Sequence, residues 1–313
     1  MPSANGRIIS VASLAMTLRL EVPAFPERGS AVPAQSARSG IGGAFDVLTA
    51  ARSVGAEVVN LCPLGTGPNS MAIRQEMHRR LIDNQAVEMV GDIGLSLVLV
   101  EEGGYYTSVM TSGIEVDLEL SALSNFTVRP GDCIYISAGD LVSDSYRDVI
   151  VHWVAGLPEG VTIALAASSL VRDVHADWLE NILPMVDVFT GNVDQARRLG
   201  AVIGCDVESA DFLSILHGEN AIAVVRDGAR GAYLRTRAYP QRRQVASLDY
   251  PVVDTLGVGA THTGVFLAGL VAGCDPLDAL RRANVAGAMA VSRPGAHGAL
   301  DDAEITRLAA TLS

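Results

Sequence analysis

The feature that most constrains the fold is a regular alternation of strand-like and helix-like segments after Asp132. Short runs of apolar and β-branched residues, typical of strands, are separated by segments of helical character. The strand-like runs lie at 133–137, 161–166, 186–189, 221–226 and 231–234, and the helices expected between them lie at 145–155, 178–183 and 194–199. This alternation predicts an α/β fold in which a mainly parallel sheet has helices on both faces. Helices at 263–272, 276–291 and 303–312 follow.

The N-terminal third departs from this pattern. Strands are expected at 7–14, 17–22 and 57–62, helices at 44–54 and 71–84, and a Pro-, Gly- and Ser-rich loop at 24–39 whose following glycines, 40–43, open the first helix. Further β-rich runs at 87–90, 95–101 and 105–110 are separated by glycines. We expect these runs to pair with the strand at Thr17 in a small sheet beside the main body. The prediction is a single domain over 1–313, with a lid formed by about 16–38 and 87–115.

Composition limits the classes of partner. The chain has 313 residues and a net charge of −12, and all of its 23 basic residues are arginine. This charge argues against a nucleic-acid partner or an anionic membrane surface, and no apolar run approaches the ~18 residues of a membrane span. The four cysteines are far apart, without metal-ligand spacing, and are expected to be buried thiols. With no visible signal peptide, these features predict a cytoplasmic protein.

A glycine-rich turn precedes the first of the C-terminal helices. Residues 254–264 read Asp-Thr-Leu-Gly-Val-Gly-Ala-Thr-His-Thr-Gly. The backbone N–H groups of such a turn, together with the helix N-terminus behind it, form a site for an anion. Gly257 and Gly259 are therefore candidates for an anion hole.

The turn closely resembles the Asp-Thr-x-Gly-Ala-Gly-Asp signature of the ribokinase/PfkB family of carbohydrate and nucleoside kinases. Four further motifs occur in the family's order: a glycine pair followed by an alanine-rich helix at 42–55, a Gly-x-Gly turn at 65–67, a strand–turn–strand at 225–232, and a helix with a central asparagine at 281–288. The resemblance implies a doubly wound, ribokinase-like α/β domain with a small β-sheet lid. It also implies transfer of the γ-phosphoryl group of ATP, with Mg²⁺, to a sugar hydroxymethyl group.

The resemblance also assigns site residues. It places the substrate at Thr17, Gly42, Gly43 and Asp46, the nucleotide at Asn192, Arg226, Gly228 and Asn284, and the transferring phosphate at Gly257 and Gly259.

The acidic residues expected of the family are replaced at several of these positions. The family's general base, an Asp, is Ala260, and the lid Asp that holds sugar hydroxyls is Thr17. The Glu that orients Mg²⁺ is Gln195, so no metal ligand is secure. A strand-end Asp-Pro of related sugar kinases falls at 166–167, both alanine, whereas the Asn of the first signature is Asp46. Loss of a general base typically costs ~10²–10⁴ in rate.

Simpler interpretations stay open for most of these residues. The glycines at 257 and 259 could serve only a tight turn, and Asn192 could cap a helix without touching a ligand. Asn284 could be a polar residue on a helix face, and Arg226 could be solvated. His262, beside the base position, could replace the missing base.

Two functions follow from the sequence. The first is a PfkB-family sugar kinase whose activity is impaired at Ala260. The second is a pseudokinase, a ligand- or partner-binding protein on a kinase scaffold. In either case the expected ligand is a small sugar or nucleoside, and the exposed edges of a lid sheet would allow a homodimer.

Overall fold

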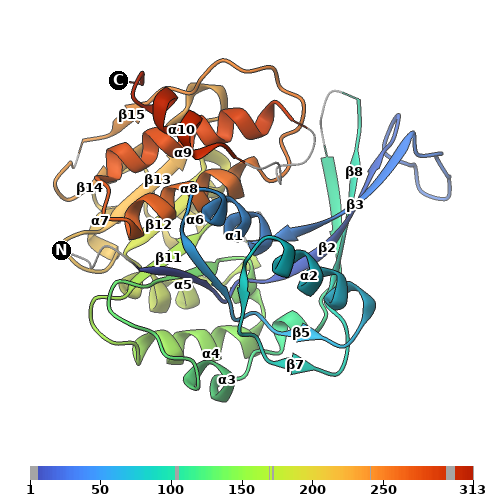
Figure 1. Cartoon of the computed structure of the whole chain (residues 1–313), viewed down its shortest axis with the longest axis horizontal. Helices are drawn as coiled ribbons and strands as arrows, with labels where there is room; N and C mark the ends of the chain where they lie inside the picture. The colour runs from blue at the N-terminus through green and yellow to red at the C-terminus, as the bar shows by residue number, and fades with distance from the viewer. Residues whose placement is uncertain are drawn as a thin grey trace.

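The main sheet runs through the centre of the body (Figure 1). The computed structural model describes residues 6–102, 106–168, 170, 173–239, 241–293 and 300–312. Within these residues the sheet has nine strands, in the spatial order β15 (Arg243–Val245), β14 (Ala232–Thr236), β13 (Ile222–Arg226), β12 (Val188–Asn192), β11 (Thr162–Ala166), β10 (Cys133–Ser137), β1 (Arg7–Ser10), β4 (Glu57–Asn60) and β6 (Asp83–Asn84). All neighbouring pairs from β13 to β6 are parallel, whereas β14 and β15 pair antiparallel.

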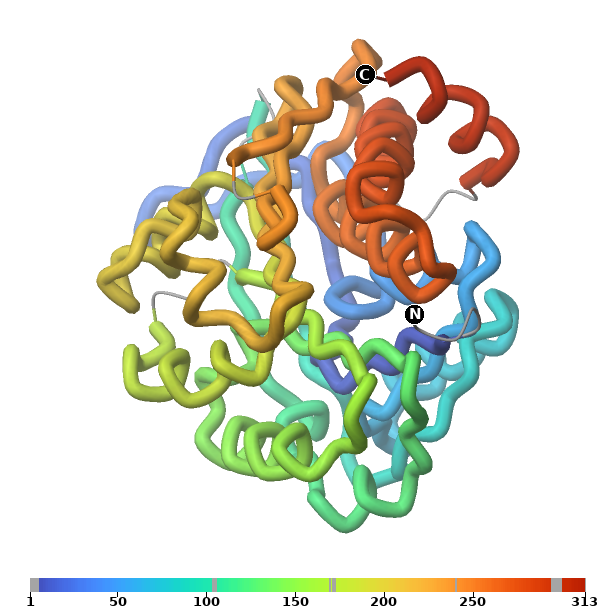
Figure 2. The backbone as a smooth tube through the Cα atoms, turned by 90° about the vertical axis from the view of Figure 1, so that its left-hand side faces the viewer, coloured from blue at the N-terminus to red at the C-terminus, as the bar shows by residue number. Residues whose placement is uncertain are grey.

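Helices cover both faces of this sheet, as the alternation predicts. One face carries α1 (Ala44–Ser53), α2 (Pro68–Arg79), α8 (Val258–Val271), α9 (Pro276–Val291) and α10 (Asp302–Ala309). The other carries α3 (Leu120–Ser124), α4 (Asp144–Ala155), α5 (Ala176–Ile182), α6 (Val193–Ile203) and α7 (Phe212–Ile215). Short 3₁₀ turns include η1 (Ile114–Val116), η2 (Asp140–Val142), η4 (Leu183–Met185) and η5 (Gly228–Arg230). Figure 2 shows α9 and α10 (orange to red) and α4 (green) on opposite sides of the body.

The strands are apolar on both sides because both faces are buried. Ile8 packs with α1 and α8, while its neighbour Ile9 packs with the α3–α7 side. In the same way, Val224 packs on the α1–α8 side of the sheet and its neighbour Val225 packs on the α3–α7 side. Such continuous apolar runs are typical of parallel sheets covered on both faces. No helix among the described residues is long and apolar enough to cross a membrane.

The order of strands reverses at β1. The chain passes from β1 to β4 and β6 on one side, then returns to β10 on the other side. The connections therefore leave the carboxyl ends of β1 and β10 in opposite directions. In open α/β sheets, ligands bind in the crevice outside such a switch point.

The small sheet beside the body is present. It contains β3 (Ser36–Gly43), β2 (Leu14–Glu21), β8 (Leu95–Val100) and β9 (Tyr106–Met110), in that order, and extends to the side in Figure 1. Register pairs Thr17 with Gly40 and with Ser96. The lid core is therefore the predicted one.

Among the local predictions for the N-terminal third, three differ clearly from the structure. Residues 36–43 form strand β3 rather than a loop and a helix start, because hydrogen bonding to β2 outweighs the low strand propensity of Gly and Ser. The β-rich run at 87–90 contributes β7 (Glu88–Met89), which pairs with β5 (Leu64–Gly65) outside the lid. The helix expected over 71–84 ends at Arg79, since Leu81 adopts a left-handed φ of 56°.

Candidate active site

The glycine-rich turn leads directly into α8. Gly257 is the N-cap, with a left-handed φ of 77°, and the helix begins at Val258 rather than at 263 as the sequence predicts. Gly259 and Ala260 therefore lie in the first helical turn. Within the described part of the chain, the amide N–H groups of Gly257, Gly259 and Ala260 find no hydrogen-bond acceptor, whereas that of Thr261 donates to the Gly257 carbonyl at 2.8 Å. Unpaired amides and the positive end of the helix dipole favour an anion here.

Arg226 supplies a positive charge at the same place. It ends β13, and its guanidinium lies against the first turn of α8, where a Cβ on Gly259 would be 3.4 Å from Nη2. Its Nη1 donates to Thr190 Oγ1 at 2.8 Å and to Thr263 Oγ1 at 3.0 Å, and both acceptors are neutral. Desolvation lowers the pKa of Arg226 to about 10, which leaves the side chain charged at neutral pH. A half-buried guanidinium held by neutral groups is available for an anionic ligand such as a phosphate.

Position 260 carries only a methyl group, and the neighbouring His262 is bonded to Asn284 through its Nε2. Asn284 Nδ2 donates to the carbonyls of Val245 at 2.8 Å and Ala246 at 3.2 Å, so its Oδ1 accepts the bond from His262 Nε2 at 3.0 Å. The remaining lone pair of His262, on Nδ1, is buried without a partner among the described residues. Burial lowers the pKa of His262 to about 3. His262 is therefore a neutral, buried residue that braces α8 against α9.

The same contacts define the surroundings of Asn284. The residue is buried, and both ends of its amide bond to groups of the protein. This geometry matches the simpler interpretation of a polar residue on a helix face, and contact with a nucleotide stays a prediction. Gly228, the other glycine assigned to the nucleotide, begins η5 just beyond β13 with a φ of 57°.

Asn192 and Gln195 form a capping box at the start of α6. Asn192 Oδ1 accepts the Gln195 N–H at 2.8 Å, and Gln195 Oε1 accepts the Asn192 N–H at 2.9 Å. Arg226 Nη2 also lies 3.5 Å from Gln195 Oε1. This oxygen is neutral, already bonded and beside a cation. Gln195 therefore offers no charged ligand for Mg²⁺, and the described residues contain no group of three potential metal-ligating side chains.

The residues assigned to the substrate meet where the lid joins the body. Thr17 lies on the lid face that looks toward the body, and a Cβ on Gly42 would be 2.8 Å from Thr17 Oγ1. Gly43 ends β3 with a φ of 69°, and the buried Asp46 lies in the first turn of the helix that follows, α1. Helices α1 and α8 pack so closely that a Cβ on Gly264 would be 2.3 Å from the Val47 carbonyl oxygen. The residues that the sequence assigns to the sugar and to the phosphate therefore lie on elements that meet at the contact of α1 with α8.

Residues at the switch point were missed from the sequence. Asp140 in η2 accepts the Ser13 N–H at 2.9 Å and so bridges the loops that follow β10 and β1. Burial raises the pKa of Asp140 to about 6. Burial also raises the pKa of Tyr135 on β10, and the charges of Asp140, Arg226 and Asp46 act on this phenol. An Asp just after an apolar strand was the available signal for Asp140, but no spacing rule marks its partner Ser13 in the loop after β1.

Known proteins resemble this chain over most of its length. A model of the pfkB family carbohydrate kinases matches residues 5–303. An uncharacterized sugar kinase of Escherichia coli K12, YegV, is 28% identical over 278 residues, which cover 87% of this chain and 84% of that protein. An ATP-dependent ribose-1-phosphate kinase of Halopiger xanaduensis is 24% identical over 301 residues, 94% of each chain.

Solved structures show the same fold. A ribokinase from Thermotoga maritima superposes with a TM-score of 0.79 at 17% identity and covers 97% of this chain and 99% of its own. A nucleoside kinase from Methanocaldococcus jannaschii gives a TM-score of 0.80 at 14% identity, over 98% of this chain and 100% of its own.

Proposed function

Because the chain belongs to the PfkB family of carbohydrate kinases, we propose that it binds ATP and a sugar or nucleoside between body and lid, and that it transfers phosphate slowly. The matched relatives support this class of substrate, since they include a ribose-1-phosphate kinase and a ribokinase. A structural neighbour from Burkholderia thailandensis was solved with inosine, and one from Cryptococcus neoformans was solved with ADP.

The first step is to hold the phosphate. The unpaired amides of Gly257, Gly259 and Ala260 lie at the start of α8, close to the guanidinium of Arg226, and would stabilise negative charge on a transferring phosphoryl group. ATP, when bound, supplies that group. Thr17, Gly42 and Gly43 at the lid junction would place the acceptor hydroxyl nearby. Phosphoryl transfer depends mainly on positioning and charge stabilisation, and this site retains residues for both.

The second step is to remove the proton of the acceptor, and here the site is deficient. The observation that carries the proposal is the Ala260 methyl group in the first turn of α8, among amides that find no acceptor in the described structure. His262 bonds to Asn284 and does not supply a base. We therefore expect turnover well below the ~1–100 s⁻¹ typical of kinases.

Restoring the carboxylate tests this proposal. Ala260→Asp should raise phosphorylation of a sugar and nucleoside panel only weakly, because Gln195 and Thr17 are unchanged, and Ala260→Asp with Gln195→Glu should raise it further. The capping box accommodates Glu at position 195, so this change preserves the start of α6. Ala260→Asn is the matched control, since it adds a side chain of equal size without a base and should give no gain.

Two results would contradict the impaired-kinase proposal. Wild-type turnover of ~1 s⁻¹ or more would show that no base is missing. Complete inactivity of the wild type and of both Asp variants, with ATP binding retained, would favour the pseudokinase. The capping box of Gln195 favours that second candidate, because the amide there is committed to helix α6.

A further inference from the structure

Two arginines face each other across the lid. Arg19 on β2 is directly opposite Arg38 on the antiparallel strand β3. Side chains in such a pair leave the sheet on the same face, with Cβ atoms ~4.5–5.5 Å apart, and like charges in this position repel. Arg19 contacts the body, so this is the face that looks toward the candidate site.

The charges of this pair are incompletely satisfied. Arg19 Nη1 is 2.5 Å from Asp254 Oδ2, while Glu21 Oε1, at 3.8 Å from Arg19 Nη2, is beyond hydrogen-bonding distance. Arg19 Nε is buried without an acceptor among the described residues. Arg38 is exposed and forms no ion pair with any residue that the structure describes. Among the described residues, Asp254 is thus the close carboxylate of Arg19, and no carboxylate pairs with Arg38.

A cavity lies beside Arg19. It has a volume of about 210 Å³ and lies between lid strands β2, β8 and β9 and the segment 252–256 that leads to α8. Arg19, Asp254, Tyr106 and Thr255 supply its polar groups, and valines supply most of the remaining wall. Strand β3 lies on the other side of β2, where Gly40 and Gly42 share the face of Arg38 and carry no side chain. Arg19 is therefore placed between this cavity and Arg38.

We infer that the acceptor sugar carries an anionic group, a carboxylate or a phosphate, which Arg19 and Arg38 bind while its reacting hydroxyl lies toward Gly42 and the start of α8. The inference rests on the proposed function, since it names the substrate class of that same site. A planar guanidinium binds either anion through two parallel hydrogen bonds. An anion shared by Arg19 and Arg38 removes their repulsion and supplies an acceptor for Arg19 Nε.

Equilibrium binding of three matched sugars tests the inference. D-glucose, D-gluconate and D-glucose 6-phosphate are titrated into the full chain at constant ionic strength, by calorimetry, with no nucleotide present. We expect the neutral sugar to bind at least about tenfold more weakly than one of the two anions, and the stronger anion identifies carboxylate or phosphate. Arg38→Gln and Arg19→Gln should each weaken the binding of that anion by about tenfold. Neither variant should change the affinity for glucose.

Arg28→Gln is the control. Arg28 is an exposed arginine of the same lid, and its substitution removes the same charge. Arg38 is also exposed on its strand, so Arg38→Gln gives an interpretable result even where Arg19→Gln impairs folding. The inference is overturned if glucose binds as well as both anions, if neither anion binds, or if Arg38→Gln and Arg28→Gln have equal effects. Phosphorylation of glucose alone would overturn the inference and leave the proposed function standing. Anion binding without any ATP binding would support the inference and overturn the proposed function.

Discussion

At the scale of single residues, Asp140 makes stability depend on pH. Its carboxyl group accepts the Ser13 N–H at the switch point, and burial raises its pKa from 3.8 to about 6. Between these values the folded state holds the proton more tightly than the unfolded state. The contribution of Asp140 to stability is therefore greatest at acid pH and declines as pH rises through about 6.

Asp140→Asn should remove this decline. The amide oxygen still accepts the Ser13 N–H and carries no charge, so the variant should gain about 2 kcal/mol relative to the wild type between pH 4 and pH 7.5. Urea unfolding at several pH values measures the difference. Asp249→Asn, at an exposed carboxylate, is the control and should give a flat difference. If the stability difference between Asp140→Asn and the wild type also does not change with pH, the Asp140 carboxyl is not desolvated.

The sequence predicts some site residues and misses others for a physical reason. Gly257, Gly259 and Ala260 are recognisable because their function depends on local order along the chain. The environment of Asn284 depends on His262 and Val245, which are distant in sequence, and only the folded structure shows that both amide ends are occupied. Asp140 was missed for the same reason.

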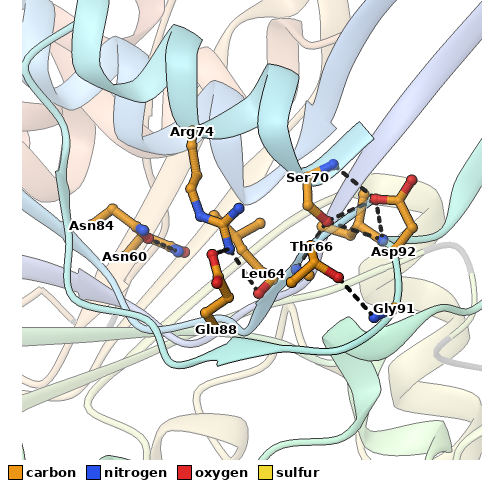
Figure 3. A network of polar contacts seen from close by, with 11 residues as sticks. Asn60, Leu64, Thr66, Ser70, Arg74, Asn84, Glu88, Gly91 and Asp92 are labelled. Carbon is orange, nitrogen blue, oxygen red and sulfur yellow. Dashed lines mark hydrogen bonds and ion pairs between the residues drawn. The ribbon is translucent and has the colours of Figure 1, made fainter. Parts of the chain in front are cut away.

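At the scale of elements, helix α2 depends on a cap from outside the helix. Asp92 lies in the segment before β8, and its carboxylate accepts the N–H groups of Asn69 at 3.0 Å and Ser70 at 2.8 Å. It also accepts the Ser70 hydroxyl at 2.8 Å, and Figure 3 shows Ser70 and Asp92 together. A Cβ on Gly67 would be 2.3 Å from the Asp92 Cγ, so the close approach requires glycine. The cap joins α2 to the strand that enters the lid.

Asp92→Ala should cost about 1–2 kcal/mol, the usual loss for a helix N-cap, and should increase amide hydrogen exchange at the start of α2. Asp92→Asn keeps a neutral acceptor and should cost less. The hydrogen bonds hold the pKa of Asp92 below its usual value, so this contribution is present above pH 4 and lost as pH falls through the lowered value. Equal stability of Asp92→Ala and the wild type, by urea unfolding at pH 7, would contradict the capping role.

The alternation of segments was sufficient to predict the body, and tertiary pairing explains the errors. Strand β3 has a glycine-rich sequence, and its partner β2 makes it a strand. Helix α8 begins five residues before the start predicted from its apolar run, and it packs against both α1 and α9. Neither contact can be predicted from the local propensities of the residues.

At the scale of the whole molecule, the outer edge of the lid is apolar and unprotected. Strand β9 is the last strand of the lid sheet, and Tyr106, Val109 and Met110 are each at least half exposed. An edge strand with exposed apolar side chains is a ready surface for pairing with a second chain. The homodimer expected from the sequence therefore stays a prediction, with β9 as its proposed contact.

Val109→Lys should shift the protein toward the monomer by placing a charge on this edge. Light scattering coupled to size-exclusion chromatography over a range of concentrations measures the change. Val90→Lys is the matched control, because Val90 is 94% exposed and lies outside the lid sheet. A monomeric wild type at all concentrations, or a dimer unaffected by Val109→Lys, would reject the β9 contact.

The close contact of α1 with α8 has a mechanical consequence. Strand β3 continues into α1 at Gly43 without an intervening loop, and Gly264 brings the backbone of α8 against that of α1. The lid strand and the two helices are therefore joined through the backbone, with no flexible connection between β3 and α1. We expect a tilt of the lid to displace α1 and, through the Gly264 contact, to displace the start of α8 as well.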